Sequence, residues 1–247
     1  MLPPKRVQLF ITCIVDSLYP SVGEAVVTVL ERLGVEVEFP EGQTCCGQPG
    51  FNGGFHAEAQ RLALHHLDVF EKSDAPVVVP SGSCAAMVIH RYPELFADDP
   101  PNLARARALA ARTFEFSQFL VEVLGVTDLG ASFNGSVTYH PSCHLSRELG
   151  VTAPPRQLLA GVQGAEVREL PHAEDCCGFG GLFSIKHDAI SAAMLDKKLE
   201  NVQASGAMTV VGCDMSCLLH MVGGLARDGS AVRCVHLAEL LAVNKGG

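Results

Sequence analysis

The sequence predicts an α/β fold made of two repeated parallel-sheet units that are related by internal duplication. Three observations support this prediction: a length of 247 residues, a cysteine pattern that occurs twice, and short apolar runs that alternate with helical stretches. The length has room for two small domains, each with its own core. Strands that alternate with helices imply parallel sheets with right-handed crossovers. We expect the first unit at residues 1–130 and the second at residues 131–247.

The cysteine pattern is the main sign of duplication. Each half contains a single cysteine, then a Cys-Cys-Gly motif about thirty residues later, and a further cysteine about forty residues beyond it. The matching cysteines lie 130, 131 and 133 positions apart, at Cys13 and Cys143, Cys45 and Cys176, and Cys84 and Cys217. Three matches in the same order, with a nearly constant offset, indicate a repeated structural unit.

In the first half, strands and helices alternate in the order expected for such a unit. Apolar runs predict strands, and apolar residues at helical spacing predict the helices between them. We expect Ser83 to cap the helix that carries Cys84. The predicted strands are 7–12, 35–39, 77–80 and 114–116, and the predicted helices are 22–33, 56–72, 83–92 and 119–124.

The second half repeats this order after a glycine-containing joint at 125–135. Its elements have the same types and the same sequence as those of the first half, which supports the duplication. The predicted strands are 137–140, 166–170, 208–212 and 232–235, and the predicted helices are 155–159, 187–204, 216–226 and 237–243.

The cysteines of each half follow three different predicted strands. Because the carboxyl ends of parallel strands lie at one edge of a sheet, thiols that are distant in sequence can meet there. Two adjacent cysteines reach one centre only if the loop folds back, and Gly47 and Gly178 supply the conformational freedom for this. The candidate cofactor and metal ligands are Cys13, Cys45, Cys46 and Cys84 in the first half, and Cys143, Cys176, Cys177 and Cys217 in the second.

Four thiolates in each half suit an iron–sulfur cluster, and we expect one [4Fe–4S] cluster per repeat. Zinc is a possible substitute because four cysteines also bind zinc. However, zinc sites usually draw on local Cys-x₂₋₄-Cys pairs, which neither set of four candidate ligands contains. Cys213 has no counterpart in the first half and is either a spare metal ligand or a core residue, whereas Cys234 is expected to be a core residue.

Composition argues against several other functions. The formal net charge is −9, and there is no tryptophan. This composition favours neither a basic surface nor base-stacking side chains, so we do not expect binding of nucleic acid. No apolar run is long enough to predict a transmembrane segment, and the N-terminal apolar run is interpreted as a strand, so we expect a cytoplasmic protein. Among the histidines, we expect His65 and His66 at the surface, and His144 and His187 facing solvent rather than cluster sulfur.

The motifs Cys-Cys-Gly-Gln-Pro, Pro-Ser-Gly-Ser-Cys and Cys-Cys-Gly-Phe-Gly-Gly resemble those of the cysteine-rich CCG-domain family. This family includes the B subunit of heterodisulfide reductase, the iron–sulfur subunit of glycolate oxidase and proteins of lactate utilization. The resemblance covers nearly the whole chain. It implies an iron–sulfur electron-transfer subunit that acts with partner subunits to oxidise L-lactate, or a related 2-hydroxy acid, with the substrate chemistry on a partner.

The sequence departs from the family pattern at one position in each half. The full pattern ends in Cys-x-x-Cys, but Ser81 and Asp214 stand where its first cysteine would be. The resemblance implies that five thiols per site support disulfide cleavage, so four thiols favour plain electron transfer. The alternatives are a thiol/disulfide redox subunit like that of heterodisulfide reductase, and a zinc-stabilised scaffold subunit.

Overall fold

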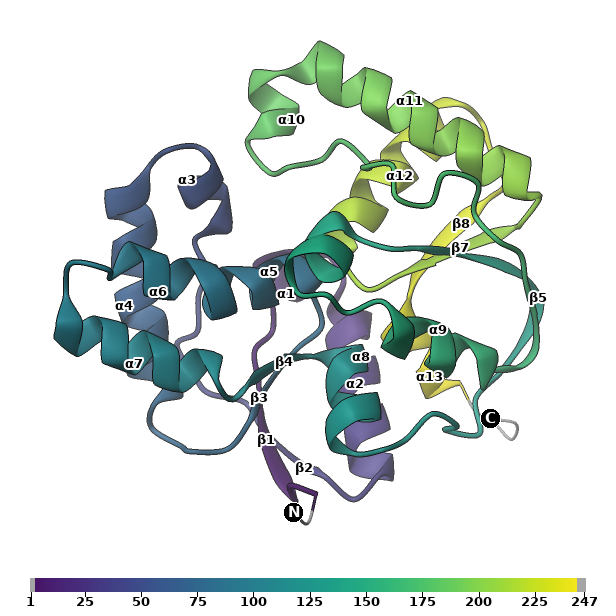
Figure 1. Ribbon diagram of the computed structural model, residues 1–247. Helices are drawn as coiled ribbons and strands as arrows, with labels where there is room; N and C mark the ends of the chain where they lie inside the picture. Colours follow the sequence, from purple (N-terminus) through teal and green to yellow (C-terminus); the bar gives the residue numbers. More distant parts are fainter. Residues whose placement is uncertain (1–2, 244–247) are drawn as a thin grey trace. The chain divides into compact units, whose positions relative to one another are not determined.

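A computed structural model describes residues 3–243, and it confirms the predicted α/β fold class. Within that range the chain forms two parallel sheets of four strands each, with helices beside them (Figure 1). The chain divides into two compact units, Met1–Gly125 and Val126–Gly247. The predicted division between residues 130 and 131 stays a prediction.

In the first unit, the described strands have the order β2-β1-β3-β4 and all pair in parallel. β1 and β3 are central, and every residue of β3 is buried. The strands are β1 (Arg6–Leu9), β2 (Glu36–Glu38), β3 (Val77–Val79) and β4 (Thr113–Glu115).

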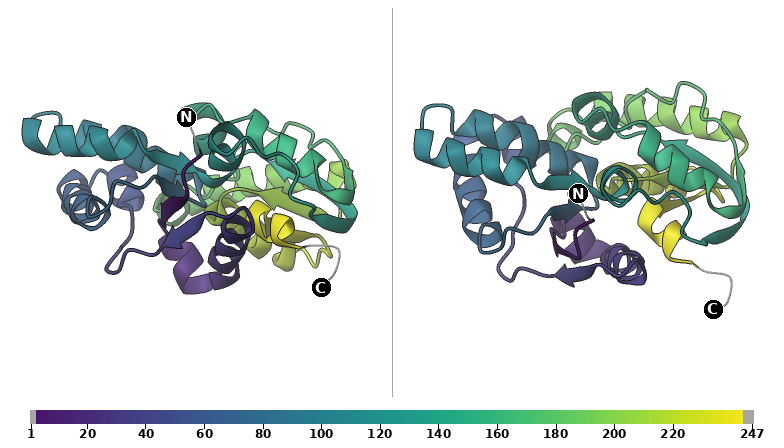
Figure 2. Two further views of the ribbon diagram at one scale, coloured as in Figure 1. Left: turned by 90° about the horizontal axis from the view of Figure 1, so that it is seen from below. Right: turned by 60° about the horizontal axis from the view of Figure 1, so that its bottom comes forward.

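The helices of the first unit flank both faces of its sheet. α4, α6 and α7 lie together on one side of the strands and α2 lies on the other, as the views in Figures 1 and 2 agree. The helices are α1 (Cys13–Leu18), α2 (Pro20–Arg32), α3 (Gln48–Asn52), α4 (His56–Phe70), α5 (Gly82–Ala86), α6 (Tyr92–Leu95), α7 (Pro100–Ala110) and α8 (Phe116–Gln118), with π-helical turns η1 (Met87–Arg91) and η2 (Phe119–Val123).

The second unit repeats this topology, with the strand order β6-β5-β7-β8 and parallel pairing throughout the described part. α11 packs on α12, while α9 contacts α13. The strands are β5 (Ser132–His140), β6 (Gln163–Val167), β7 (Thr209–Gly212) and β8 (Arg233–His236). The helices are α9 (Ala153–Ala160), α10 (Phe183–Lys186), α11 (Asp188–Ser205), α12 (Met215–Arg227) and α13 (Leu237–Ala242), with a π-helical turn η3 (His144–Glu148).

Two local predictions were wrong. Helix α5 is capped by Ser81 rather than Ser83, because the Ser81 hydroxyl accepts the Cys84 N–H at 3.3 Å. Strand β6 begins at Gln163 instead of 166, because β5 extends back to Ser132 and pairs with this earlier segment. The short helices α1, α3 and α10 were also not predicted, since helices of four to six residues are too short to show periodicity.

His66 is buried, contrary to the prediction that it lies at the surface. Its ring stacks on Phe70 with centroids 4.3 Å apart and meets the edge of Phe10 at 4.5 Å. Its neighbour His65 is exposed. Burial lowers the pKa of His66 to about 3, so the imidazole is neutral inside this aromatic cluster. Because α4 is amphipathic, its positions 65 and 66 face opposite environments.

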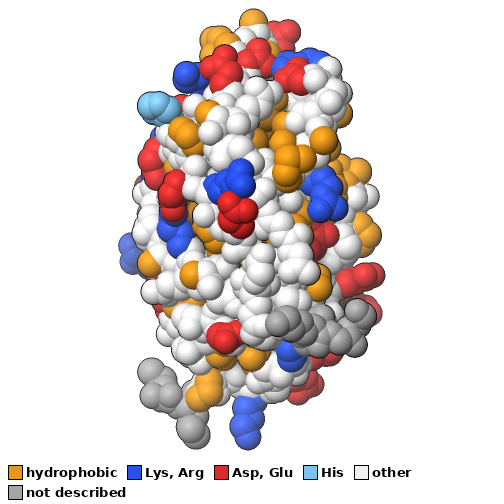
Figure 3. Space-filling model, turned by 90° about the vertical axis from the view of Figure 1, so that its right-hand side faces the viewer, with side chains coloured by type: hydrophobic (Ala, Val, Ile, Leu, Met, Phe, Trp, Pro, Cys, Tyr) orange, Lys and Arg blue, Asp and Glu red, His pale blue; other side chains and the backbone are white. Residues whose placement is uncertain are grey.

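Charged side chains of both signs are interspersed over the face shown in Figure 3. Exposed charged side chains of opposite sign also form ion pairs, such as Arg156 with Glu169 and Arg168 with Glu166. Pairs this exposed contribute little to stability. In the part of the chain that the structure describes, none of the helices has the length and apolar character needed to cross a membrane.

Tyr92 is fully buried, and its hydroxyl donates a hydrogen bond to the Cys46 carbonyl at 2.9 Å. We expect Tyr92→Phe to lower the free energy of unfolding by about 1–2 kcal/mol, because the buried carbonyl loses its partner. Chemical denaturation under anaerobic conditions measures this change. The half-buried Tyr19 provides the control, and Tyr19→Phe should change stability by less than about 0.5 kcal/mol. Equal effects of the two variants would contradict the proposed role of the Tyr92 hydroxyl.

Candidate metal centres

The predicted cysteines of each half all follow the carboxyl ends of strands. Cys13 begins α1 directly after β1, and Cys143 lies between β5 and η3. The Cys-Cys-Gly motifs lie in the loops after β2 and β6. Cys84 lies in α5, after β3, and Cys217 lies in the first turn of α12, after β7. The parallel topology therefore directs all three segments of each half to one edge of its sheet.

In the first half, the four thiols form a continuous series of contacts. The Sγ atoms of Cys46 and Cys84 are 3.4 Å apart. The Cys45 thiol is within hydrogen-bonding reach of the thiols of both Cys13 and Cys46. Thus three segments separated by more than thirty residues bring their sulfur atoms together, and Cys46 and Cys84 are buried at one end of the series.

The second half repeats this series with the matching cysteines. The Cys176 thiol contacts those of Cys143 and Cys177, and the Cys177 thiol contacts that of Cys217. Cys177 and Cys217 are buried, as their counterparts are. The structure therefore brings together all eight cysteines that the sequence selected, in two sets of four. Their roles as ligands stay predictions.

A glycine with a left-handed backbone follows each cysteine pair. Gly47 and Gly178 both have φ of +87°, and their N–H groups lie 3.5 and 3.4 Å from the Sγ atoms of Cys45 and Cys176. This conformation turns the chain back so that both cysteines of a pair face the same centre. At Gly178, a Cβ atom would lie only 2.6 Å from the Ser191 carbonyl oxygen.

The crowded thiols favour a positively charged partner. Hydrogen bonds from Cys13, Cys46 and the Gly47 N–H lower the pKa of Cys45, so that one sulfur of the first set carries charge easily. Cys13 and Cys46 donate to it, and this contact together with burial raises their pKa values. Four adjacent thiolates would repel one another in a partly buried site. A metal centre removes this repulsion, so the soft donor set of each half fits metal binding.

Ser81 and Asp214 stand where the family pattern has an additional cysteine. Each of them caps the helix that carries the last thiol of its half. Ser81 accepts the N–H of Cys84, as described above, and Asp214 accepts the N–H of Ser216 at 3.1 Å. Contact with Cys176 and burial raise the pKa of Cys143, and the nearby Asp214, which is itself buried, adds to this effect. The departure from the family pattern thus removes a thiol and adds a helix cap in each half.

The loops that carry the cysteine pairs are held by different side chains in the two halves. In the first, Gln43 accepts the Ile11 N–H at 2.8 Å and donates to the Leu9 carbonyl at 3.2 Å. In the second, the fully buried Lys198 donates from Nζ to the Ala173 carbonyl at 3.0 Å. Burial lowers the pKa of Lys198. Sequence analysis did not select Lys198, because a lysine in a helix is usually exposed.

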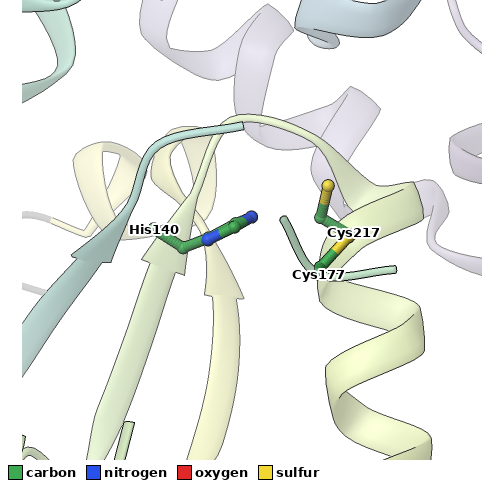
Figure 4. Close-up of side chains that lie close together, drawn as sticks. All are labelled: His140, Cys177 and Cys217. Atoms are coloured by element: carbon green, nitrogen blue, oxygen red, sulfur yellow. The ribbon is translucent and has the colours of Figure 1, made fainter. Parts of the chain in front are cut away.

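Sequence analysis also missed His140 as part of the second site. This residue ends β5 three positions before Cys143, and its side chain is only 2% exposed. The ligand atoms of His140, Cys177 and Cys217 all lie within 4.8 Å of one another (Figure 4). Contact with Cys177 and with His140 lowers the pKa of Cys217 to about 6, against the effect of burial. His140 lies at the carboxyl end of a central strand, and this position is the signal by which the sequence could have indicated it as part of the site.

The remaining cysteines and histidines have different surroundings. Cys213 is buried with its Sγ atom 3.9 Å from the Tyr139 hydroxyl, and its role as a metal ligand stays a prediction. Burial raises the pKa of Cys234 to about 12. His187 is exposed, as expected, but His144 is half-buried with Nδ1 3.5 Å from the Cys143 Sγ atom.

One side of the first site opens onto a pocket of about 200 Å³. Cys13 and Cys45 line this pocket, together with Gln43 and Phe39. Cys13 is exposed while Cys46 and Cys84 are buried, so the first set of thiols extends from the core to the surface. This arrangement gives the site a short path to solvent or to another molecule.

These features match a known family. The model of the cysteine-rich (CCG) domain matches the chain twice, at residues 7–89 and 137–222, which are the segments that bring the two sets of thiols together. The chain belongs to the family of cysteine-rich CCG-domain proteins, which confirms the predicted resemblance.

Among its relatives are proteins with a more specific name. The lactate utilization protein A of an Exiguobacterium species is 49% identical over 237 residues, which cover 96% of both chains. The lactate utilization protein A 1 of Bacillus cereus is 50% identical over 237 residues, covering 96% of this chain and 98% of the relative. A crystal structure of a hypothetical protein from Helicobacter pylori has the same fold, with a TM-score of 0.63 and 11% identity; it covers 99% of this chain, which spans 50% of that longer one.

The backbone at Gly178 makes a prediction about the second site. Gly178→Ala should lower the free energy of unfolding by more than about 2 kcal/mol, because a left-handed alanine is strained and its Cβ overlaps the Ser191 carbonyl. Gly229 is a matched control, since it has φ of +64° and open space around the Cβ position. Gly229→Ala should cost about 1 kcal/mol. Anaerobic denaturation measures both, and similar losses would show that contact with Ser191 does not restrict this loop.

Proposed function

We propose that the chain is an iron–sulfur electron-transfer subunit of a complex that oxidises L-lactate or a related 2-hydroxy acid. One [4Fe–4S] cluster would be held in each half, by Cys13, Cys45, Cys46 and Cys84 and by Cys143, Cys176, Cys177 and Cys217. The observation that carries this proposal is the meeting of four thiols at one sheet edge, twice in the same chain. The names of the relatives support lactate as the substrate of the system.

The arrangement of the thiols favours an iron–sulfur centre over structural zinc. Each set comes from three segments at the ends of different strands, whereas zinc sites commonly use local cysteine pairs two to four residues apart. Four thiolates are the ligand set of [4Fe–4S] clusters, which supply one-electron redox chemistry when bound. Zinc has no redox chemistry, so it would support only a scaffold.

The protein's own groups provide conditions for electron transfer at each site. The N–H groups of Gly47 and Gly178 point to cysteine sulfur, and such hydrogen bonds stabilise added negative charge and raise a reduction potential. The buried thiols of Cys46 and Cys84 keep one end of the first site away from water. Cys13 and Cys45 line the surface pocket, where a redox partner can approach.

Substrate oxidation is assigned to a partner subunit. Conversion of a 2-hydroxy acid to a 2-keto acid releases two electrons and two protons, and hydride chemistry of this kind is usually carried by a flavin or nicotinamide. The sequence lacks the glycine-rich fingerprint of such cofactors. The chain therefore needs a partner that takes electrons from the acid, and two electron carriers in this chain would pass them to an acceptor.

Metal analysis of the anaerobically purified chain tests the two sites separately. We expect about eight iron atoms per chain, four in each half. Cys46→Ser and Cys177→Ser should each lose about half of this iron, because each removes one buried thiolate from one site. Cys234→Ser is the control and should keep all of the iron, because Cys234 belongs to neither set of four thiols. Stoichiometric zinc with no iron in the wild-type chain would contradict the proposal.

The role in lactate oxidation is tested with the complex isolated anaerobically from its own cells. Addition of L-lactate should bleach the visible absorbance of the iron–sulfur centres as they become reduced. The complex carrying Cys46→Ser and Cys177→Ser together should show no such bleaching, while lactate still reduces the cofactor of the partner. Reduction of a disulfide substrate by the isolated chain, without response to L-lactate, would instead identify a thiol/disulfide redox subunit.

A further inference from the structure

His140 occupies a position where a buried polar ring needs a partner. It is the last residue of β5, the central strand that pairs with both β6 and β7. Its side chain is 2% exposed, and neither ring nitrogen has an N or O hydrogen-bond partner among the described residues. A buried imidazole without such a partner is costly. The ring of His66 in the first half also lacks N or O partners, but among the described residues His140 and not His66 belongs to a group of side chains that could hold a metal ion.

The imidazole is directed at the second set of thiols. In Figure 4 the ring extends from the end of its strand toward Cys177 and Cys217, which come from the loop after β6 and from the start of α12. The three ligand atoms lie within 4.8 Å of one another, and all three residues are buried. Imidazole nitrogen and thiolate sulfur at such distances form a donor set for one metal ion or one edge of a cluster.

The first half has no imidazole at the matching position. Phe10 lies three residues before Cys13, as His140 lies three residues before Cys143. Phe10 packs against the rings of His66 and Phe70 instead of facing the thiols with a polar atom. The two halves therefore share four thiols but differ at the end of their central strand. Packing alone explains an aromatic residue there, but it does not explain an imidazole that lies beside two buried thiols.

We propose that His140 is a nitrogen ligand of the metal centre in the second half, so that the two halves hold centres with different ligand sets. This inference rests on the proposed function, because it assumes that the thiols bind an iron–sulfur centre. In this ligand set the imidazole takes the place of one of the four thiolates at the second centre, and a neutral imidazole bound to iron leaves less negative charge on the centre than a thiolate does. Replacement of cysteine by histidine raises the potential of iron–sulfur centres for this reason. The second centre is therefore the more easily reduced of the two.

Pulsed electron paramagnetic resonance of the chain labelled with ¹⁵N-histidine tests the inference. In the full chain carrying Cys46→Ser, which isolates the second centre, the reduced centre should show a strong coupling to a histidine nitrogen. The additional change His140→Phe copies the residue found at the matching place in the first half. It should abolish the coupling and lower the midpoint potential of the second centre.

The variant His144→Gln is the matched comparison, because His144 also lies beside a cysteine of this site. The coupling to a histidine nitrogen should remain in His144→Gln. Loss of this coupling in His144→Gln but not in His140→Phe would overturn the inference. The measurement on the Cys46→Ser chain does not require the double variant to fold. If this chain contains iron but shows no coupling to a histidine nitrogen, the inference is overturned while the proposed function stands. A wild-type chain without iron would instead refute the proposed function itself.

Discussion

Mutual contact of four thiols at the carboxyl edge of a parallel sheet is the constraint around which each half is organised. Thiols in contact cannot all ionise without a compensating charge, because their charges repel in a partly buried environment. The backbone is arranged around this requirement. The cysteines follow the ends of three strands, a left-handed glycine turns each pair inward, and the start of a helix supplies the last sulfur. The fold therefore brings sulfur donors from three separate segments to one place in each half.

Duplication has kept this arrangement while the surroundings have diverged. The eight thiols and the two glycines match closely, but Phe10 corresponds to His140, and Ser81 corresponds to Asp214. His66 and Lys198 also occupy matching places, since each lies ten residues after the first residue of its long helix. One site is thus set among aromatic rings, whereas the other is set among ionisable groups. The two sets of thiols therefore lie in different electrostatic environments, and metal centres bound by them would differ in reduction potential.

The sequence was sufficient for the fold class and for the cysteines that meet, because both follow from patterns that repeat along the chain. Alternating strands and helices fix a parallel sheet, and a parallel sheet fixes which ends of the strands share an edge. The burial of individual polar residues could not be predicted from such repeating patterns. His66, His140 and Lys198 lie inside the protein, where packing of whole helices and strands determines their surroundings. Likewise, Ser81 rather than Ser83 caps α5, because the cap depends on the local backbone dihedrals and not on the presence of a serine.

The helix caps at Ser81 and Asp214 also restrict how such a site can change over time. A cysteine at either position would add a possible sulfur donor, but it would remove an oxygen that accepts an N–H at the start of the helix bearing Cys84 or Cys217. Cysteine is a poor substitute in that role, because its sulfur is a weak acceptor. A lineage that gains a fifth sulfur here therefore loses rigidity in the very segment that presents the fourth. In each half, a single residue position therefore determines both the number of sulfur donors and the capping of the helix.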